Sequence, residues 1–214
     1  MSFNKIFLYV LAAFSLVIIG CFSSNNTKHY YQVFYAGELR FDKPVNSIVR
    51  VKTFEIDKIY KKYNIVYRTS PYEMFYYNNH LWAVKPDDMI TDAVTNHIKQ
   101  SGMFSEVISK LEKKPDYVIS GRIVALDEID SGDRWYARAA LLFTVSDFMS
   151  GKVLYSHYFD RRKEVFNSEP VYIFRAISEI IEEETAKFLK DSKPYLFDRK
   201  SEKSGVDSDF QPES

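Results

Sequence analysis

Two segments with helical periodicity, lying far apart in the chain, constrain its fold most strongly. The first runs from Pro86 to Gly102; a proline followed by two aspartates suits a helix start, and a glycine suits a helix end. The second runs from about Pro170 to Lys190 with apolar residues on one face, while Glu182-Glu183-Glu184 is expected to face solvent. Helices this far apart, with strand-like segments around them, indicate an α+β domain with helices on one face of a sheet.

The other segments of the domain have the composition of β-strands. They alternate apolar and polar residues or are rich in aromatic ones, and breaks containing proline, glycine and serine separate them. The expected strands are 30–35, 47–56, 64–68, 72–77, 117–129, 135–147 and 153–159. The last three are expected to form a meander with turns at 131–133 and 149–152. The sequence therefore predicts a single compact α+β domain with a mixed or antiparallel sheet and two main helices.

The amino terminus has the layout of a secretory signal. A short basic start is followed by an apolar run, Ile6 to Ile19, which is shorter than the roughly 20 residues that a membrane span needs. The junction Ile19-Gly20-Cys21 resembles the bacterial lipobox, and the resemblance implies cleavage before Cys21 and acylation of its thiol and new amino group. Cys21 is the only cysteine, so it has no disulfide partner within the chain. An ordinary signal peptide with an incidental cysteine, or an uncleaved anchor, is the alternative.

The chain divides into four parts on this interpretation. Residues 1–20 are the signal peptide, 21–29 a lipidated polar tether, 30–191 the folded domain, and 192–214 a polar tail expected to be disordered. Roughly 194 residues remain after cleavage, which is enough for one domain with a core of its own.

Composition and motifs predict a protein without catalytic chemistry or a cofactor. The chain has 29 basic and 29 acidic residues, so it offers no overall field for nucleic acid. Its four histidines lack metal-ligand spacing, and no nucleophile elbow or phosphate-binding loop is present in the sequence. The acidic residues Asp127, Glu128, Asp130 and Asp133 are expected to form a soluble surface turn, and 161–163 a solvated basic edge strand.

The segment from Ile65 to Val107 carries a family resemblance. Its features, in order, are Val66-Tyr67-Arg68, Tyr72-Glu73-Met74, Tyr76-Tyr77, Trp82-Ala83, Pro86 and Ser101-Gly102-Met103-Phe104, with Asp116–Ile123 further on. In this order and spacing they resemble the auxiliary lipoproteins of ABC-type transport systems. These accompany transporters of the mammalian-cell-entry (MCE) class, including the paraquat-inducible and toluene-tolerance types. The chain departs from the family pattern at Val84-Lys85 and in its charged tail.

The resemblance implies a compact fold similar to the amino-terminal domain of TolB and a non-catalytic role. It implies an accessory lipoprotein that assists movement of lipid or hydrophobic compounds across a bacterial envelope. The expected partners are the bilayer, through lipidated Cys21, an ABC transporter or MCE-domain protein, and a second copy of the chain. The expected location faces the periplasm, with the outer membrane favoured over the inner. A stand-alone structural lipoprotein, or an envelope enzyme with a cryptic site, is the alternative.

Five residues in the resembling segment are expected to contact a partner or lipid: Tyr67, Arg68, Tyr76, Tyr77 and Trp82. Large amphipathic aromatic residues and arginine dominate the energetics of many interfaces. The competing interpretation is that the aromatic residues pack within the sheet.

Overall fold

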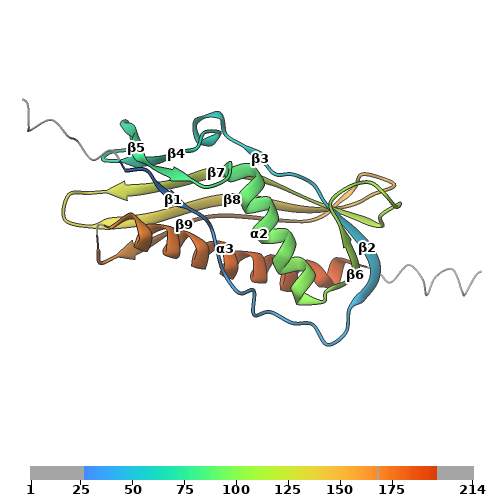
Figure 1. Ribbon diagram of the computed structural model, residues 1–214. Helices are drawn as coiled ribbons and strands as arrows, with labels where there is room; N and C mark the ends of the chain where they lie inside the picture. Colours follow the sequence, from blue (N-terminus) through green and yellow to red (C-terminus); the bar gives the residue numbers. More distant parts are fainter. Residues whose placement is uncertain (1–26, 168, 197–214) are drawn as a thin grey trace, which may run out of the picture.

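The computed structural model describes residues 27–167 and 169–196 as one curled mixed sheet with two helices on one face (Figure 1). This confirms the predicted α+β architecture. Residues 1–26, which include the predicted signal peptide and Cys21, lie outside the described residues, as do residue 168 and residues 197–214.

The sheet is organised around one long strand, β7 (Tyr117–Asp130). On one side β7 pairs antiparallel with β8 (Trp135–Asp147), which pairs antiparallel with β9 (Val153–Val165). On its other side it pairs in parallel with three short strands, which are β2 (Val45–Val51), β3 (Glu55–Ile56) and β4 (Asn64–Arg68). The remaining strands are β5 (Met74–Trp82), antiparallel to β4, then β1 (His29–Tyr31), parallel to β5, and β6 (Phe104–Ile108), parallel to β2.

Both helices form where the sequence predicts them. Helix α2 (Pro86–Ser101) ends at Gly102, whose φ of 63° is the left-handed conformation that glycine adopts without strain. Helix α3 (Pro170–Ser192) lies along β8 and β9 and also contacts α2 (Figure 1). Its apolar residues are buried against the sheet, where Phe188 packs 5.2 Å from Phe143 of β8 between ring centroids.

One face of α3 differs from the prediction. Glu184 is only 7% exposed and accepts hydrogen bonds from Arg161 and His157 of β9, at 2.9 and 2.7 Å. Lys163 of β9 pairs in the same way with Glu179 at 2.5 Å. The acidic face of α3 is therefore only partly solvated, because β9 turns its basic residues toward it. Arg161 and Lys163, two residues of the predicted solvated basic edge strand, are thus held in ion pairs with α3.

Several boundaries also differ from those expected. The segment 47–56 is divided into β2 and β3, 104–108 forms strand β6, and β9 extends to Val165. The fold continues beyond α3 as the 3₁₀ turn Lys193–Tyr195, and Leu196 is buried. Because Lys193 Nζ donates to the carbonyl of Lys43 at 2.7 Å, the start of the expected tail packs on the domain.

The segment joining β1 to β2 crosses the two helices (Figure 1). Its backbone N–H groups donate to side chains of α3, from Phe34 to Ser178 at 3.2 Å and from Gly37 to Glu182 at 2.9 Å. Further on, Phe41 donates to the last residue of α2, Ser101, at 2.8 Å. These bonds fix the segment 32–44 across the helical layer.

Candidate functional site: an aromatic end of the sheet

The predicted contact residues of β4 and β5 separate onto two faces of the sheet. Side chains alternate along a strand, and the registers place Tyr67 beside Glu128 and Arg68 beside Ile129. Tyr67 and Tyr77 lie on the face that carries the helices, with ring centroids 4.6 Å apart. Arg68 and Tyr76 lie on the opposite face. A single contact surface made by these four predicted residues is therefore wrong, because they lie on opposite faces of the sheet.

Rings from three strands form a continuous cluster on the helix-bearing face. We define this aromatic cluster as His29, Tyr31, Tyr67, Phe75, Tyr77 and His80. Neighbouring ring centroids lie 4.6 to 5.6 Å apart, and Tyr31 reaches Phe174 of α3 at 4.4 Å. Its members are half-buried or exposed, and Phe75 retains 41% of its surface. The cluster therefore presents aromatic rings to the exterior next to the start of α3.

Trp82 belongs to the core. Its side chain is 2% exposed and packs edge-on against Phe174, 4.9 Å between centroids. The side chain cannot form part of an accessible contact surface on this domain. Among the predicted contact residues, Tyr67 and Tyr77 are the two that join the aromatic cluster.

Arg68 holds a buried carboxylate on the opposite face. Its Nε donates to Oδ2 of Asp127 at 2.5 Å, and the hydroxyl of Tyr60 donates to the same oxygen at 2.7 Å. Asp127 is fully buried, and Arg138 lies 4.0 Å away as a second cation. Asp127 is thus part of a structural ion network rather than the predicted surface turn. Tyr76 also serves the fold, since its hydroxyl donates to the carbonyl of Ile59 at 3.0 Å.

Glu128 adds an ionisable group to the aromatic cluster. Its carboxylate accepts a hydrogen bond from the Tyr77 hydroxyl at 3.1 Å, and the residue is 2% exposed. Burial raises the pKa of Glu128 to about 7, Tyr77 opposes the shift, and the nearby charge of Asp130 adds to it. Burial raises the pKa of Tyr77 most, and the charge of Glu128 and the hydrogen bond to it raise it further. Near neutral pH the cluster therefore contains a carboxyl group that changes between neutral and charged forms.

Replacing Glu128 with glutamine is expected to reduce the pH dependence of stability. The pKa of Glu128 rises from 4.5 to about 7 on folding, so between these values the folded chain binds more protons than the unfolded chain. The free energy of unfolding therefore falls as pH rises through this window and levels off above it. Urea unfolding at a series of pH values measures this effect. From about pH 5 to 8, the free energy of unfolding should fall by about 1–3 kcal/mol more for wild type than for Glu128→Gln. Equal profiles would show that Glu128 ionises normally.

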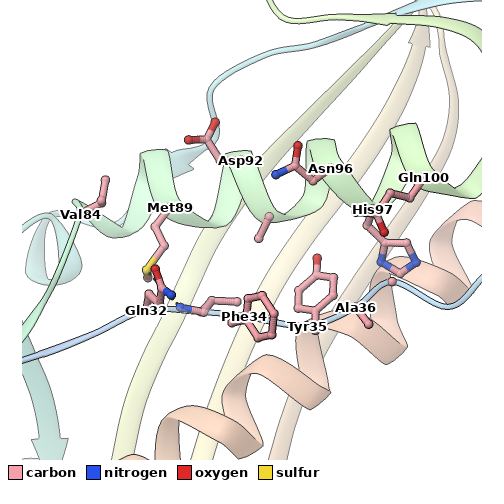
Figure 2. Close-up of a pocket in the computed structure, with 13 residues that line it drawn as sticks. Gln32, Phe34, Tyr35, Ala36, Val84, Met89, Asp92, Asn96, His97 and Gln100 are labelled. Atoms are coloured by element: carbon pink, nitrogen blue, oxygen red, sulfur yellow. Dashed lines mark hydrogen bonds between the residues drawn. The ribbon is translucent and has the colours of Figure 1, made fainter.

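A second feature, which the sequence analysis missed, is a cavity between the segment 32–44 and α2 (Figure 2). It measures about 280 Å³, close to the lower limit of roughly 300 Å³ for small-molecule pockets. His97 on α2 lines it, is 1% exposed, and has no hydrogen-bond partner for either ring nitrogen among the described residues. Burial, with the charge of Arg40, lowers the pKa of His97 to about 4, so its imidazole is neutral.

No metal site or membrane-crossing helix is found in residues 27–167 and 169–196. His29 and His80 stack with centroids 5.3 Å apart, although they are remote in sequence. However, no three histidine, cysteine or acidic side chains of this part converge as metal ligands. None of its helices is both long and apolar enough to span a bilayer.

Comparison with solved structures supports the fold. Protein XCC0632 from Xanthomonas campestris, a DUF330 family protein, matches with a TM-score of 0.69 and 16% identity, covering 78% of this chain and 96% of its own. A second crystal structure, of an uncharacterised protein, matches with a TM-score of 0.64 and 16% identity, covering 77% and 98%. None of the curated proteins shows significant sequence similarity to the chain.

The family is identified by sequence. Residues 39–187 match the family of ABC-type transport auxiliary lipoprotein components. The matched region runs from the segment before β2 into α3, and so includes α2, most of α3 and eight of the nine strands. This chain belongs to that family, as its sequence motifs predict, and the family identifies it as an accessory envelope lipoprotein.

Proposed function

We propose that this chain is a non-catalytic, lipid-anchored accessory component of an MCE-class ABC transporter, and that it docks through the aromatic cluster. The transported compounds are lipids or other hydrophobic molecules. Family membership supports the transport role, and the partly exposed rings beside Glu128 are the observation that supports the docking surface.

The chemistry of the cluster fits a protein partner that presents basic side chains. Half-buried aromatic rings supply a large contact area at a small cost in conformational entropy. Glu128, with Asp130 next to it on the turn side, places negative charge beside the rings. An arginine or lysine of the partner would then meet a ring face and the half-buried carboxylate of Asp130, while Glu128 lies buried behind the rings.

Replacing Phe75 with serine tests the docking surface. Phe75 is 41% exposed, so the change is expected to leave the domain folded and to reduce co-purification with the transporter subunits. Tyr158→Ser is the matched control, because Tyr158 is 56% exposed on β9, away from the cluster. Both thermal midpoints should stay within a few degrees of wild type. Folded Phe75→Ser protein that still retains its ATPase, permease or MCE-domain partner would contradict this docking surface.

Replacing Cys21 with alanine tests the anchor. Diacylglycerol on the Cys21 thiol, together with an acylated amino terminus, gives the multiple chains that stable anchoring needs. The variant is expected to incorporate no radiolabelled palmitate and to leave the membrane fraction if it is still processed. Equal labelling of wild type and variant would exclude Cys21 as the attachment site. Fractionation of wild-type cells tests the proposed periplasm-facing location on the outer membrane.

A further inference from the structure

We propose that one end of the domain lies directly against the bilayer, with Tyr72 and Phe166 inserted at the membrane–water interface. We define the tip by the described residues of three adjacent chain reversals: 69–73 between β4 and β5, 131–134 between β7 and β8, and 166, 167 and 169 between β9 and α3. The inference rests on the lipid anchor of the proposed function and goes beyond it by fixing the orientation of the domain.

The strand registers bring the three reversals to one end of the sheet. Arg68, at the end of β4, pairs with both Ile129 of β7 and Met74 of β5. Trp135, the first residue of β8, pairs with both Asp130 and Val165, the last residues of β7 and β9. Figure 1 shows these reversals at the end of the sheet where α3 begins.

The tip exposes aromatic side chains that have no packing role in the domain. Tyr72 is 96% exposed and Phe166 is 93% exposed, the two highest values among the large hydrophobic residues that the structure describes. They flank the tip, roughly 15–20 Å apart if neighbouring strands are spaced about 4.8 Å. Val171, in the first turn of α3, adds a third apolar side chain at 45% exposure. Exposed aromatic residues of this kind are typical of protein or membrane contact sites.

The length of chain before the described residues selects the membrane as the occupant. Cys21 precedes Thr27 by six residues, so a fully extended tether spans about 20 Å. β1 runs parallel to β5, with His29 beside His80. The chain before β1 therefore points along β5 toward Met74 and the tip. In this direction the tip lies roughly 13 Å beyond Thr27. The opposite end of the sheet, at Tyr117 of β7, lies roughly 27 Å from Thr27 in the other direction. The tether can therefore bring the tip to the lipid surface, but it cannot bring the opposite end there.

The charges at the tip favour aromatic insertion over electrostatic attraction. The exposed ionic residues of the three reversals are Glu73, Asp133, Arg134 and Glu169. A set with three acids and one base gains nothing from an anionic surface. Aromatic rings, by contrast, are favoured at the interface of any bilayer, whatever the headgroup charge. Contact at the tip should therefore not require anionic lipid and should occur on zwitterionic vesicles.

The test uses the lipidated full-length protein with single cysteines introduced as probe sites. Because lipidation blocks the thiol of Cys21, the only native cysteine, a new cysteine is the one group that reacts with an environment-sensitive fluorophore. The variants are Tyr72→Cys and Phe166→Cys at the tip. Met149→Cys is the control, since Met149 is 62% exposed in the turn between β8 and β9 at the opposite end. Each protein is reconstituted into phosphatidylcholine vesicles carrying a headgroup-level spin-label quencher, with and without phosphatidylglycerol.

We expect quenching at positions 72 and 166 to exceed that at 149 by more than about twofold on both kinds of vesicle, because only interfacial probes lie within reach of the quencher. Protein that floats with the vesicles but shows equal quenching at all three positions would overturn the orientation while leaving the anchor intact. Quenching at the tip that requires phosphatidylglycerol would overturn insertion by the aromatic residues. Protein that does not float at all, with a reactive thiol at Cys21, would overturn the anchor and the orientation together.

Discussion

Replacing Arg68 with alanine is expected to lower the free energy of unfolding by about 3 kcal/mol. The reason is that Asp127, which is fully buried, would lose the partner that lies 2.5 Å away. Removing one member of a buried ion pair typically costs about 3–5 kcal/mol, since the remaining charge stays desolvated. Arg138, at 4.0 Å from Asp127, compensates in part, which places the expected value at the lower end of that range. Urea denaturation of wild type and variant measures the difference.

A double-mutant cycle with Asp127→Ala separates the pair from other effects of truncation. The two single variants should each be strongly destabilised, and the double variant should cost less than their sum, because no unpaired buried charge remains. Arg122→Ala is the control, since Arg122 pairs with Asp57 at 2.7 Å but is 56% exposed. A surface pair of this kind contributes about 1 kcal/mol or less. Additive costs at positions 68 and 127 would show that the pair does not act as a unit.

This expectation changes how Arg68 can be used in a test of docking. The sequence pattern singles out Arg68 as a contact residue because arginine between two strand residues must find water, an acid or a partner. The acid it finds lies on β7, 59 residues further along the chain. A loss of transporter binding in Arg68→Ala would therefore report damage to the fold, so Phe75→Ser is the better probe.

Local signals in the sequence predict those elements whose limits depend on local chemistry. Helix α2 begins at a proline and ends at a glycine, and the structure follows both. Strands β4 and β8 match the expected ranges: turn residues bound β8 on both sides, and Ser70-Pro71 follow β4. The lengths of β5 and β9 depend instead on their neighbours. β9 continues through charged residues to Val165, since each residue pairs with β8 and Arg161 and Lys163 meet acids on α3.

An irregularity in β7 explains why the acidic residues were misplaced. Ile119 and Ile123 are buried, and strict alternation from them would place Asp127 on the helix-bearing face. The register shifts between Ile123 and Ala125, which reverses the faces beyond that point. Asp127 then faces Arg68, and Glu128 faces the aromatic cluster. The sequence has no glycine or proline at this shift to signal it, so neither site could be assembled from spacing alone.

Replacing Trp82 with alanine is expected to cost about 3–5 kcal/mol of stability, the range for large aromatic residues in a core. The indole is 2% exposed and packs on Phe174 at the start of α3, so truncation leaves a cavity where the helix meets the sheet. Phe75→Ala, in the aromatic cluster at 41% exposure, is expected to cost much less.

The two variants together separate core from contact surface, which the sequence could not do because both residues lie in one aromatic-rich segment. Thermal unfolding should show a large fall in midpoint for Trp82→Ala and a shift of a few degrees for Phe75→Ala. Trp82→Phe is the volume-conserving control and should recover most of the loss, since an aromatic ring still fills the space against Phe174. Folded Trp82→Ala protein of near wild-type stability would contradict the burial of this side chain. It would also return Trp82 to the surface that meets a partner.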